Sequence, residues 1–228
     1  FVEEYEIIGE ADDEINNPTD LDFHPILTQK QVWITNKGTE GSGGSTVTFW
    51  NAGLPSQTSE LKKDGNAWHF MSLPTAIAFS ENTNFATAPG VKDANHSGGT
   101  FTGPTLWSSD MDIYAEPSGG NGSHLDMLHQ SPFSMGIAAW KDNAFFVFCD
   151  YHGYIHMYDF QEDHGPGNDD HSDGKVWEYI DFDVNMINDD LPSHLVYDKS
   201  SNFLYVIDAG NGRIIRMNPE SGNVTGTF

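Results

Sequence analysis

The sequence predicts an all-β fold in which one small antiparallel sheet is repeated along the chain. Three observations lead to this prediction. Short apolar runs alternate with polar turns, long amphipathic helical runs are missing, and a segment that opens with proline recurs about every 58 residues. The 228 residues include 23 glycines and 11 prolines, and 13% are aromatic, a composition that favours short strands joined by many turns.

The repeats can be aligned on their openings, whose spacings are 56, 58 and 60 residues. The openings begin at Pro18, Pro74, Pro132 and Pro192. Each is followed by a second strand-like run, at 31–36, 84–88, 145–150 and 203–208. Third runs follow at 46–50, 154–160 and 213–217. In the second copy, a loop at 89–104 precedes the runs 105–107 and 111–114, which we expect to be strands.

The last repeat carries the most informative motif. Its second run ends in Asp208-Ala209-Gly210-Asn211-Gly212 and is followed by Arg213 and Ile214. A proline-led opening combined with an Asp-x-Gly-Asn-x-Arg-Ile turn resembles one blade of an NHL-type β-propeller. The resemblance implies a β-propeller with NHL-like blades of about 58 residues, four of them visible, in a single domain that covers residues 1–228.

The two ends of the chain leave the number of blades open. Residues 1–9 are expected to form an outer strand, and 223–228 to begin another. Either the N-terminal strand completes the last blade and closes a four-bladed ring, or the chain is a fragment of a longer, six-bladed ring. We favour the fragment, truncated at one or both ends, because two strand-like ends suggest an interrupted series.

Charge and cysteine content narrow the classes of partner. The chain has 34 acidic and 10 basic residues and a formal charge of -24, which repels nucleic acids and anionic membrane surfaces. An apolar run of about 18 residues, long enough to span a membrane, is missing. The single cysteine, Cys149, ends an apolar run, so we expect a buried thiol and no internal disulfide.

Three N-glycosylation sequons bear on where the protein acts. They begin at Asn95, Asn121 and Asn223, all in turn-rich contexts where a glycan could be accommodated. The lack of disulfides is more typical of a reducing compartment. We expect a secreted or cell-surface glycoprotein, periplasmic if the source is bacterial.

An acidic loop at 163–174 is the first candidate metal site. Asp169-x-His171-x-Asp173-Gly174 follows the opening of a calcium loop, in which oxygen ligands alternate and glycine permits a sharp turn. Asp163 lies just before it. Histidine stands at the third position, where Asp or Asn is usual, and Ile180 stands where a bidentate Glu is expected. The alternative is an acidic loop that is simply solvated.

Histidines near the blade openings are the second candidate. His194 lies in the last opening, and His124 and His129 precede the third. Because inner strands converge on the propeller axis, such imidazoles could meet around one metal ion in the central channel. The NHL resemblance extends to peptidyl-hydroxyglycine amidating lyases, which bind zinc in this manner. Only His194 occupies a comparable place, so the resemblance does not imply a complete three-histidine channel site.

The sequence contains no complete catalytic set that we recognise, and the catalytic residues stay unknown. It therefore predicts an extracellular binding or assembly module that presents acidic loops to a protein, a glycan or a divalent cation, with calcium as the expected ion. The alternative is a metal-dependent lyase or hydrolase that uses zinc or another transition metal. His194 and His129 would then be ligands, and Asp20 the general base.

Overall fold

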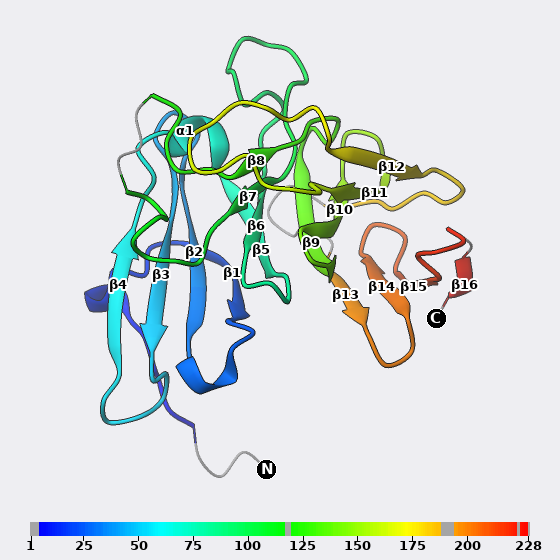
Figure 1. Cartoon of the computed structure of the whole chain (residues 1–228). Helices are drawn as coiled ribbons and strands as arrows, with labels where there is room; N and C mark the ends of the chain where they lie inside the picture. Colours follow the sequence, from blue (N-terminus) through cyan, green and yellow to red (C-terminus); the bar gives the residue numbers. More distant parts are fainter. Residues whose placement is uncertain (1–4, 117–119, 188–193, 223, 228) are drawn as a thin grey trace.

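The computed structural model describes residues 5–116, 120–187, 194–222 and 224–227. Within these residues, sixteen strands form four antiparallel sheets of four strands each (Figure 1). In every sheet the strands pair in the order in which the chain makes them, so each sheet is a simple meander. We name the sheets blades 1 to 4.

The elements have the following bounds. Blade 1 consists of β1 (Pro18–Phe23), β2 (Val32–Thr39), β3 (Gly43–Trp50) and β4 (Thr58–Lys62), and blade 2 of β5 (Pro74–Phe79), β6 (Phe85–Pro89), β7 (Thr105–Trp107) and β8 (Asp126–Met127). Blade 3 consists of β9 (Ser134–Lys141), β10 (Ala144–Cys149), β11 (Tyr154–Asp159) and β12 (Lys175–Tyr179), and blade 4 of β13 (Leu195–Asp198), β14 (Phe203–Asp208), β15 (Arg213–Met217) and β16 (Val224–Thr227). The short helical segments are η1 (Ala11–Asp13), η2 (Leu27–Gln29) and α1 (Ala67–Phe70).

The four blades are arranged as part of a β-propeller. The first strands of successive blades contact one another, β1 with β5, β5 with β9 and β9 with β13. Figure 1 shows the blades following each other from blue to red like sectors of a fan. The first strand of each blade is therefore the inner one and the fourth strand the outer one, which confirms the predicted fold.

Side chains of the inner strands join neighbouring blades. On β1, the carboxylates of Asp20 and Asp22 accept hydrogen bonds from the backbone amides of Ile77 and Phe79 on β5, at 3.0 and 2.8 Å. Burial raises the pKa of both carboxyl groups. These bonds satisfy amides at the free edge of β5. Asp20 thus holds two blades together, a structural role that differs from the general base predicted for the alternative enzyme.

The hydrophobic core lies between blades. Trp33 of blade 1 packs with Phe79, Phe85 and Trp107 of blade 2, all fully or almost fully buried. The other face of blade 2 is rich in alanine and packs against larger side chains of blade 3, such as Phe145. A third cluster joins blades 3 and 4. Successive side chains of a central strand such as β10 thus serve opposite interfaces, as the alternating pattern of the sequence requires.

The predicted repeats agree with the observed strands at most positions. Pro18 and Pro74 are the first residues of β1 and β5, and Pro132 precedes β9 by two residues. Pro192 lies outside the described residues. The second and third runs of blades 1, 3 and 4 are confirmed as strands, with shifts of a few residues at their ends.

The run 111–114 is a turn, so the strand predicted there is wrong. The carbonyl of Asp110 accepts hydrogen bonds from the amides of Ile113 and Tyr114, which curls the chain, and Lys62 of β4 donates to the carbonyls of Met111 and Tyr114. The fourth strand of blade 2 is β8 instead.

The outer strand predicted at 1–9 is absent from its described part. Residues 5–9 have no regular structure, and the carbonyl of Ile8 accepts a hydrogen bond from Gln57, which anchors this segment to blade 1. The outer strand of blade 4 is β16, from the end of the chain. Residues 5–9 therefore do not complete blade 4, and the total number of blades stays a prediction.

The motif that suggested the fold forms a tightly bonded turn between β14 and β15. The carboxylate of Asp208, which is fully buried, accepts hydrogen bonds from Arg213 Nε at 2.6 Å, from the side chain of Asn211 and from the backbone amide of Asn185. Cys149 is a buried free thiol, as expected. Among the described helices none has the length and apolarity that crossing a bilayer requires.

Candidate metal centre

The candidate site lies where blade 2 meets a loop of blade 3. The loop 160–174 joins β11 to β12 and passes over the segment that leads into β8. Two backbone hydrogen bonds hold it there, from the amide of His164 to the carbonyl of Leu125 at 3.2 Å and from the amide of Gly167 to the carbonyl of His124 at 2.9 Å. This contact brings histidines of the loop next to a histidine of blade 2.

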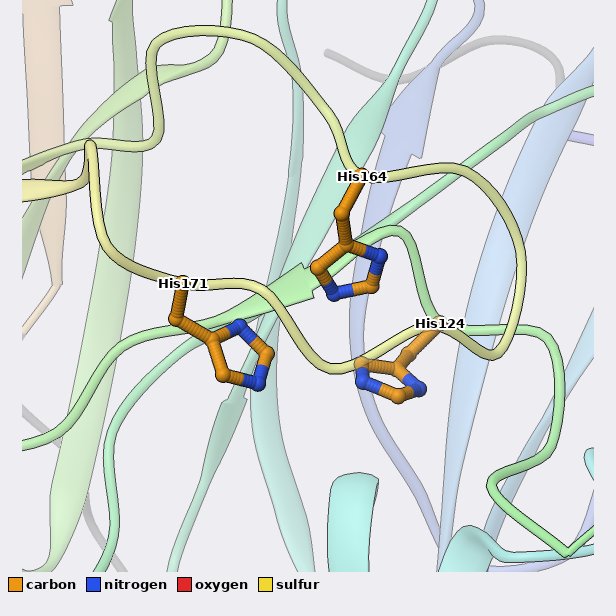
Figure 2. A group of neighbouring side chains, drawn as sticks. All are labelled: His124, His164 and His171. Atoms are coloured by element: carbon orange, nitrogen blue, oxygen red, sulfur yellow. The ribbon is translucent and has the colours of Figure 1, made fainter.

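Three histidines converge at this contact. His124, His164 and His171 each offer a ring nitrogen, and the three nitrogens lie within 4.8 Å of one another. Figure 2 shows the three rings turned toward a common space. We call this group the three-histidine cluster. Among the described residues it is the one group of three or more His, Cys, Asp or Glu donors whose atoms come this close.

Hydrogen bonds fix which nitrogen of each ring is available. The Nδ1 atoms of His124 and His164 lie 2.9 and 2.7 Å from the backbone carbonyls of Asn121 and Gly165, and a carbonyl can only accept. Nδ1 must therefore carry the proton in both rings. Each Nε2 then keeps a lone pair, and that of His164 is buried without a hydrogen-bond partner.

The third ring is oriented by a carboxylate. His171 Nδ1 lies 2.6 Å from Asp126 Oδ1, and the Asp126 side chain is fully buried. The backbone amide of Met127 also points at this nitrogen, but from 3.4 Å, so the shorter contact decides that Nδ1 donates to the carboxylate. Nε2 of His171 therefore carries no proton and also keeps a lone pair. A carboxylate behind a ligating histidine is the usual outer-shell arrangement of metal sites in proteins.

Burial keeps the His124 ring uncharged. His124 stacks on Phe70 of α1, with ring centroids 3.7 Å apart. This burial, together with the neighbouring His164 and His171, lowers the pKa of His124 to about 3, against the opposing hydrogen bond to Asn121. A neutral imidazole is the form that binds metal, so His124 needs no deprotonation at neutral pH.

The donor set decides the class of ion. Three imidazole nitrogens suit zinc, copper, iron or nickel, whereas calcium takes six to eight oxygen ligands. The chemistry of the three-histidine cluster therefore fits a divalent transition-metal ion.

The cluster combines residues from both candidate sites of the sequence. His124 was expected in a channel, and His171 in a calcium loop. His164, which the sequence analysis did not select, completes the group. His124 and His129 flank β8, an outer strand, so they lie away from the inner strands where we expected them.

The acidic residues of the predicted calcium loop make hydrogen bonds within the loop. Asp163 accepts a hydrogen bond from the amide of Gly165, and Asp173 one from the amide of Glu162. Asp163, Asp169 and Asp173 do not form a three-donor group in the part of the chain that is described. Calcium binding by this loop stays a prediction.

The remaining predicted residues lie elsewhere. His194 is exposed just before β13 and interacts electrostatically with Asp20 on β1, so it faces the inner side of blades 1 and 4. The side chains of Asn95 and Asn121 are exposed. Asn223 lies outside the described residues.

Comparisons with known proteins identify the fold only. No family model matches the chain, and no curated protein matches its sequence. An auxiliary nutrient binding protein from Bacteroides ovatus superposes with a TM-score of 0.59 at 15% identity, over 94% of this chain and 42% of that one. Hydrazine synthase from Kuenenia stuttgartiensis gives 0.55 at 10% identity, over 100% of this chain and 52% of that one.

A second auxiliary nutrient binding protein, from Bacteroides thetaiotaomicron, gives a TM-score of 0.55 at 12% identity, over 94% of this chain and 42% of that one. The chain thus spans about half or less of the length of these structures. At such low identity the likeness supports the β-propeller fold and assigns no activity.

Proposed function

We propose that this chain is a propeller binding module that holds a divalent transition-metal ion, zinc or a metal of similar preference, at the three-histidine cluster. One observation carries the proposal: three histidines from two blades bring one ring nitrogen each within 4.8 Å of one another. Each Nδ1 already lies against an oxygen acceptor, so we infer that Nε2 is the nitrogen that each ring offers to the metal. Imidazoles arranged in this way are ready to bind a metal, because neither their tautomers nor their orientations need to change.

A binding role agrees with the fold and with its relatives in structure. The names of two superposed proteins describe auxiliary nutrient binding, which accords with a propeller that presents loops to a ligand. We further propose that the blades are of the NHL type, and that the protein is secreted or displayed at the cell surface, or periplasmic if bacterial. Its partner would be a protein or a glycan, and Asn95 and Asn121 would carry glycans.

The metal proposal is tested by metal content and affinity. Protein stripped with a chelator is titrated with Zn²⁺ in competition with a chromophoric chelator, and bound zinc is counted by elemental analysis. We expect one equivalent. In the His164→Ala variant, affinity should fall by more than the roughly 10–100-fold that the loss of an outer-shell partner costs.

The matched control is His152→Ala, which removes an exposed imidazole from the turn between β10 and β11. Its affinity should equal that of the wild type. Wild-type protein that binds no stoichiometric zinc, or His164→Ala that binds zinc as tightly as the wild type, would contradict the proposal. The same titration with Ca²⁺ and the Asp169→Asn variant tests the calcium prediction for the loop.

A further inference from the structure

The three-histidine cluster supplies three ligands, and no fourth protein donor joins it. Among the described residues, no further His, Cys, Asp or Glu atom belongs to the group. Asp126, the nearest carboxylate, is bonded to His171 Nδ1 and so lies behind that ring. Structural zinc sites are closed by four protein ligands, whereas zinc sites with three protein ligands keep a fourth position for water or a substrate.

A fourth imidazole lies beside the cluster with an unused nitrogen. His129 follows β8 by two residues, and its ring centroid is 6.5 Å from that of His171. Its Nδ1 atom is buried and has no hydrogen-bond partner. A buried polar atom without a partner costs free energy, so a bound group that pairs with it would recover that cost.

Aromatic contacts hold His129 at this place. Its ring packs on Phe101, with centroids 3.6 Å apart, and His69 lies on the same phenyl ring at 6.3 Å. His69 Nδ1 is committed to the carbonyl of Ala94 at 2.9 Å. Phe101, in the loop 90–104 between β6 and β7, thus forms one wall beside the cluster, and the His129 ring packs against that wall.

The charge balance favours an anion in the open position. A dication bound by three neutral imidazoles, with Asp126 as the carboxylate directly bonded to a ligand, leaves one net positive charge at a half-buried site. Asp170 also interacts with His171, but its carboxylate is exposed and bonded to Ser172. A monovalent anion bound to the ion would complete the neutralisation.

We propose that the metal ion keeps one coordination position open on the side of His129, and that a small carboxylate occupies it. One carboxylate oxygen would bind the ion, and the other would accept a hydrogen bond from His129 Nδ1. His129 would then position the ligand without binding the metal. This inference rests on the proposed metal binding and names the class of ligand that the site takes.

The test uses the full chain loaded with Co²⁺, whose visible absorption reports the coordination of the ion. Sodium acetate is the probe, and acetamide, which is neutral and of the same shape, is its control. We expect acetate to change the spectrum saturably and acetamide to leave it unchanged. In the His129→Phe variant, which keeps a ring against Phe101, Co²⁺ affinity should be unchanged and acetate affinity should fall about tenfold, the effect of losing one hydrogen bond to a charged group.

Two further variants make the result specific. His129→Asn keeps an amide donor and should retain part of the acetate affinity, and His152→Phe, at the exposed turn, should behave as the wild type. If Co²⁺ binds but acetate leaves the spectrum unchanged, or if both His129 variants bind acetate as the wild type does, the open position is refuted while the metal site stands. Failure of Co²⁺ to bind would overturn both proposals.

Discussion

The contact between Asp126 and His171 allows the metal site to be tested without removing a ligand. Asp126→Asn keeps the size of the side chain and an oxygen acceptor but removes its charge. Loss of an outer-shell carboxylate lowers metal affinity about 10–100-fold, which corresponds to about 1.4–2.7 kcal/mol. Because the contact is only 2.6 Å long and the carboxylate is fully buried, we expect a value in the upper half of this range.

The same substitution should have little effect on the metal-free fold. The second oxygen, Asp126 Oδ2, is buried without a hydrogen-bond partner, so the charged side chain already carries a desolvation cost. The amide avoids part of that cost while it weakens the bond to His171. We therefore expect the free energy of unfolding of the metal-free protein to change by less than about 1 kcal/mol.

Zinc affinity is measured by chelator competition, and stability by chemical denaturation in excess chelator. Asp170→Asn is the matched control, because it removes the same charge one residue from His171 but leaves the buried contact intact; its zinc affinity should stay within about threefold of the wild type. If Asp126→Asn binds zinc as tightly as the wild type, Asp126 does not orient a metal ligand and the reasoning fails.

Three further predictions concern the fold. Asp208→Ala leaves Arg213 without its buried partner and should lower the free energy of unfolding by about 3–5 kcal/mol, against less than about 1 kcal/mol for Asp181→Ala, which removes an exposed carboxylate; equal losses would contradict this. Burial raises the pKa of Asp93, but four hydrogen bonds from its own loop outweigh burial and lower it to about 2. The ionised Asp93 carboxylate therefore stabilises the fold at pH values above its ordinary pKa of 3.8, and this contribution is lost as the pH falls toward 2. The free energies of unfolding of Asp93→Asn and of the wild type, measured against pH, should converge near pH 2; a constant difference between them would refute this. Burial raises the pKa of the Cys149 thiol to about 11. At pH 8, about 0.5 below the pKa of a free thiol, a thiol reagent should therefore label Cys149 only after the protein unfolds. Rapid labelling of the native protein would contradict this.

The fold could be predicted because its signals are local and repeated. Pro18 and Pro74 begin inner strands, and the turn at Asp208 supplies its own hydrogen bonds within a few residues. Alternation of apolar and polar side chains marks strands of five or more residues. The strand predicted at 105–107 is β7, but β8 has only two residues, which is too short for a period to appear, so the outer edge of blade 2 was missed.

The candidate site depends on contacts that no local pattern reveals. His164 meets His124 because the loop 160–174 pairs with the backbone beside β8, about 40 residues earlier in the chain. His171 stands at a spacing typical of an oxygen-ligand loop, yet its Nδ1 bonds to Asp126 of another blade. The sequence thus predicted that residues such as His124 and His171 bind metal, but not that the fold brings their rings together.

The position of the three-histidine cluster links metal binding to local opening of the structure. One of the three histidines belongs to blade 2 and two belong to the loop 160–174, so a metal ion bound to all three would have to dissociate before the loop leaves β8. Saturating zinc should therefore slow hydrogen exchange at the amides of His164 and Gly167, which bond across this junction, while amides in blade 1 keep their rates. The ion would act as a reversible crosslink between blade 2 and the loop of blade 3, so the concentration of free metal would determine how often this junction opens.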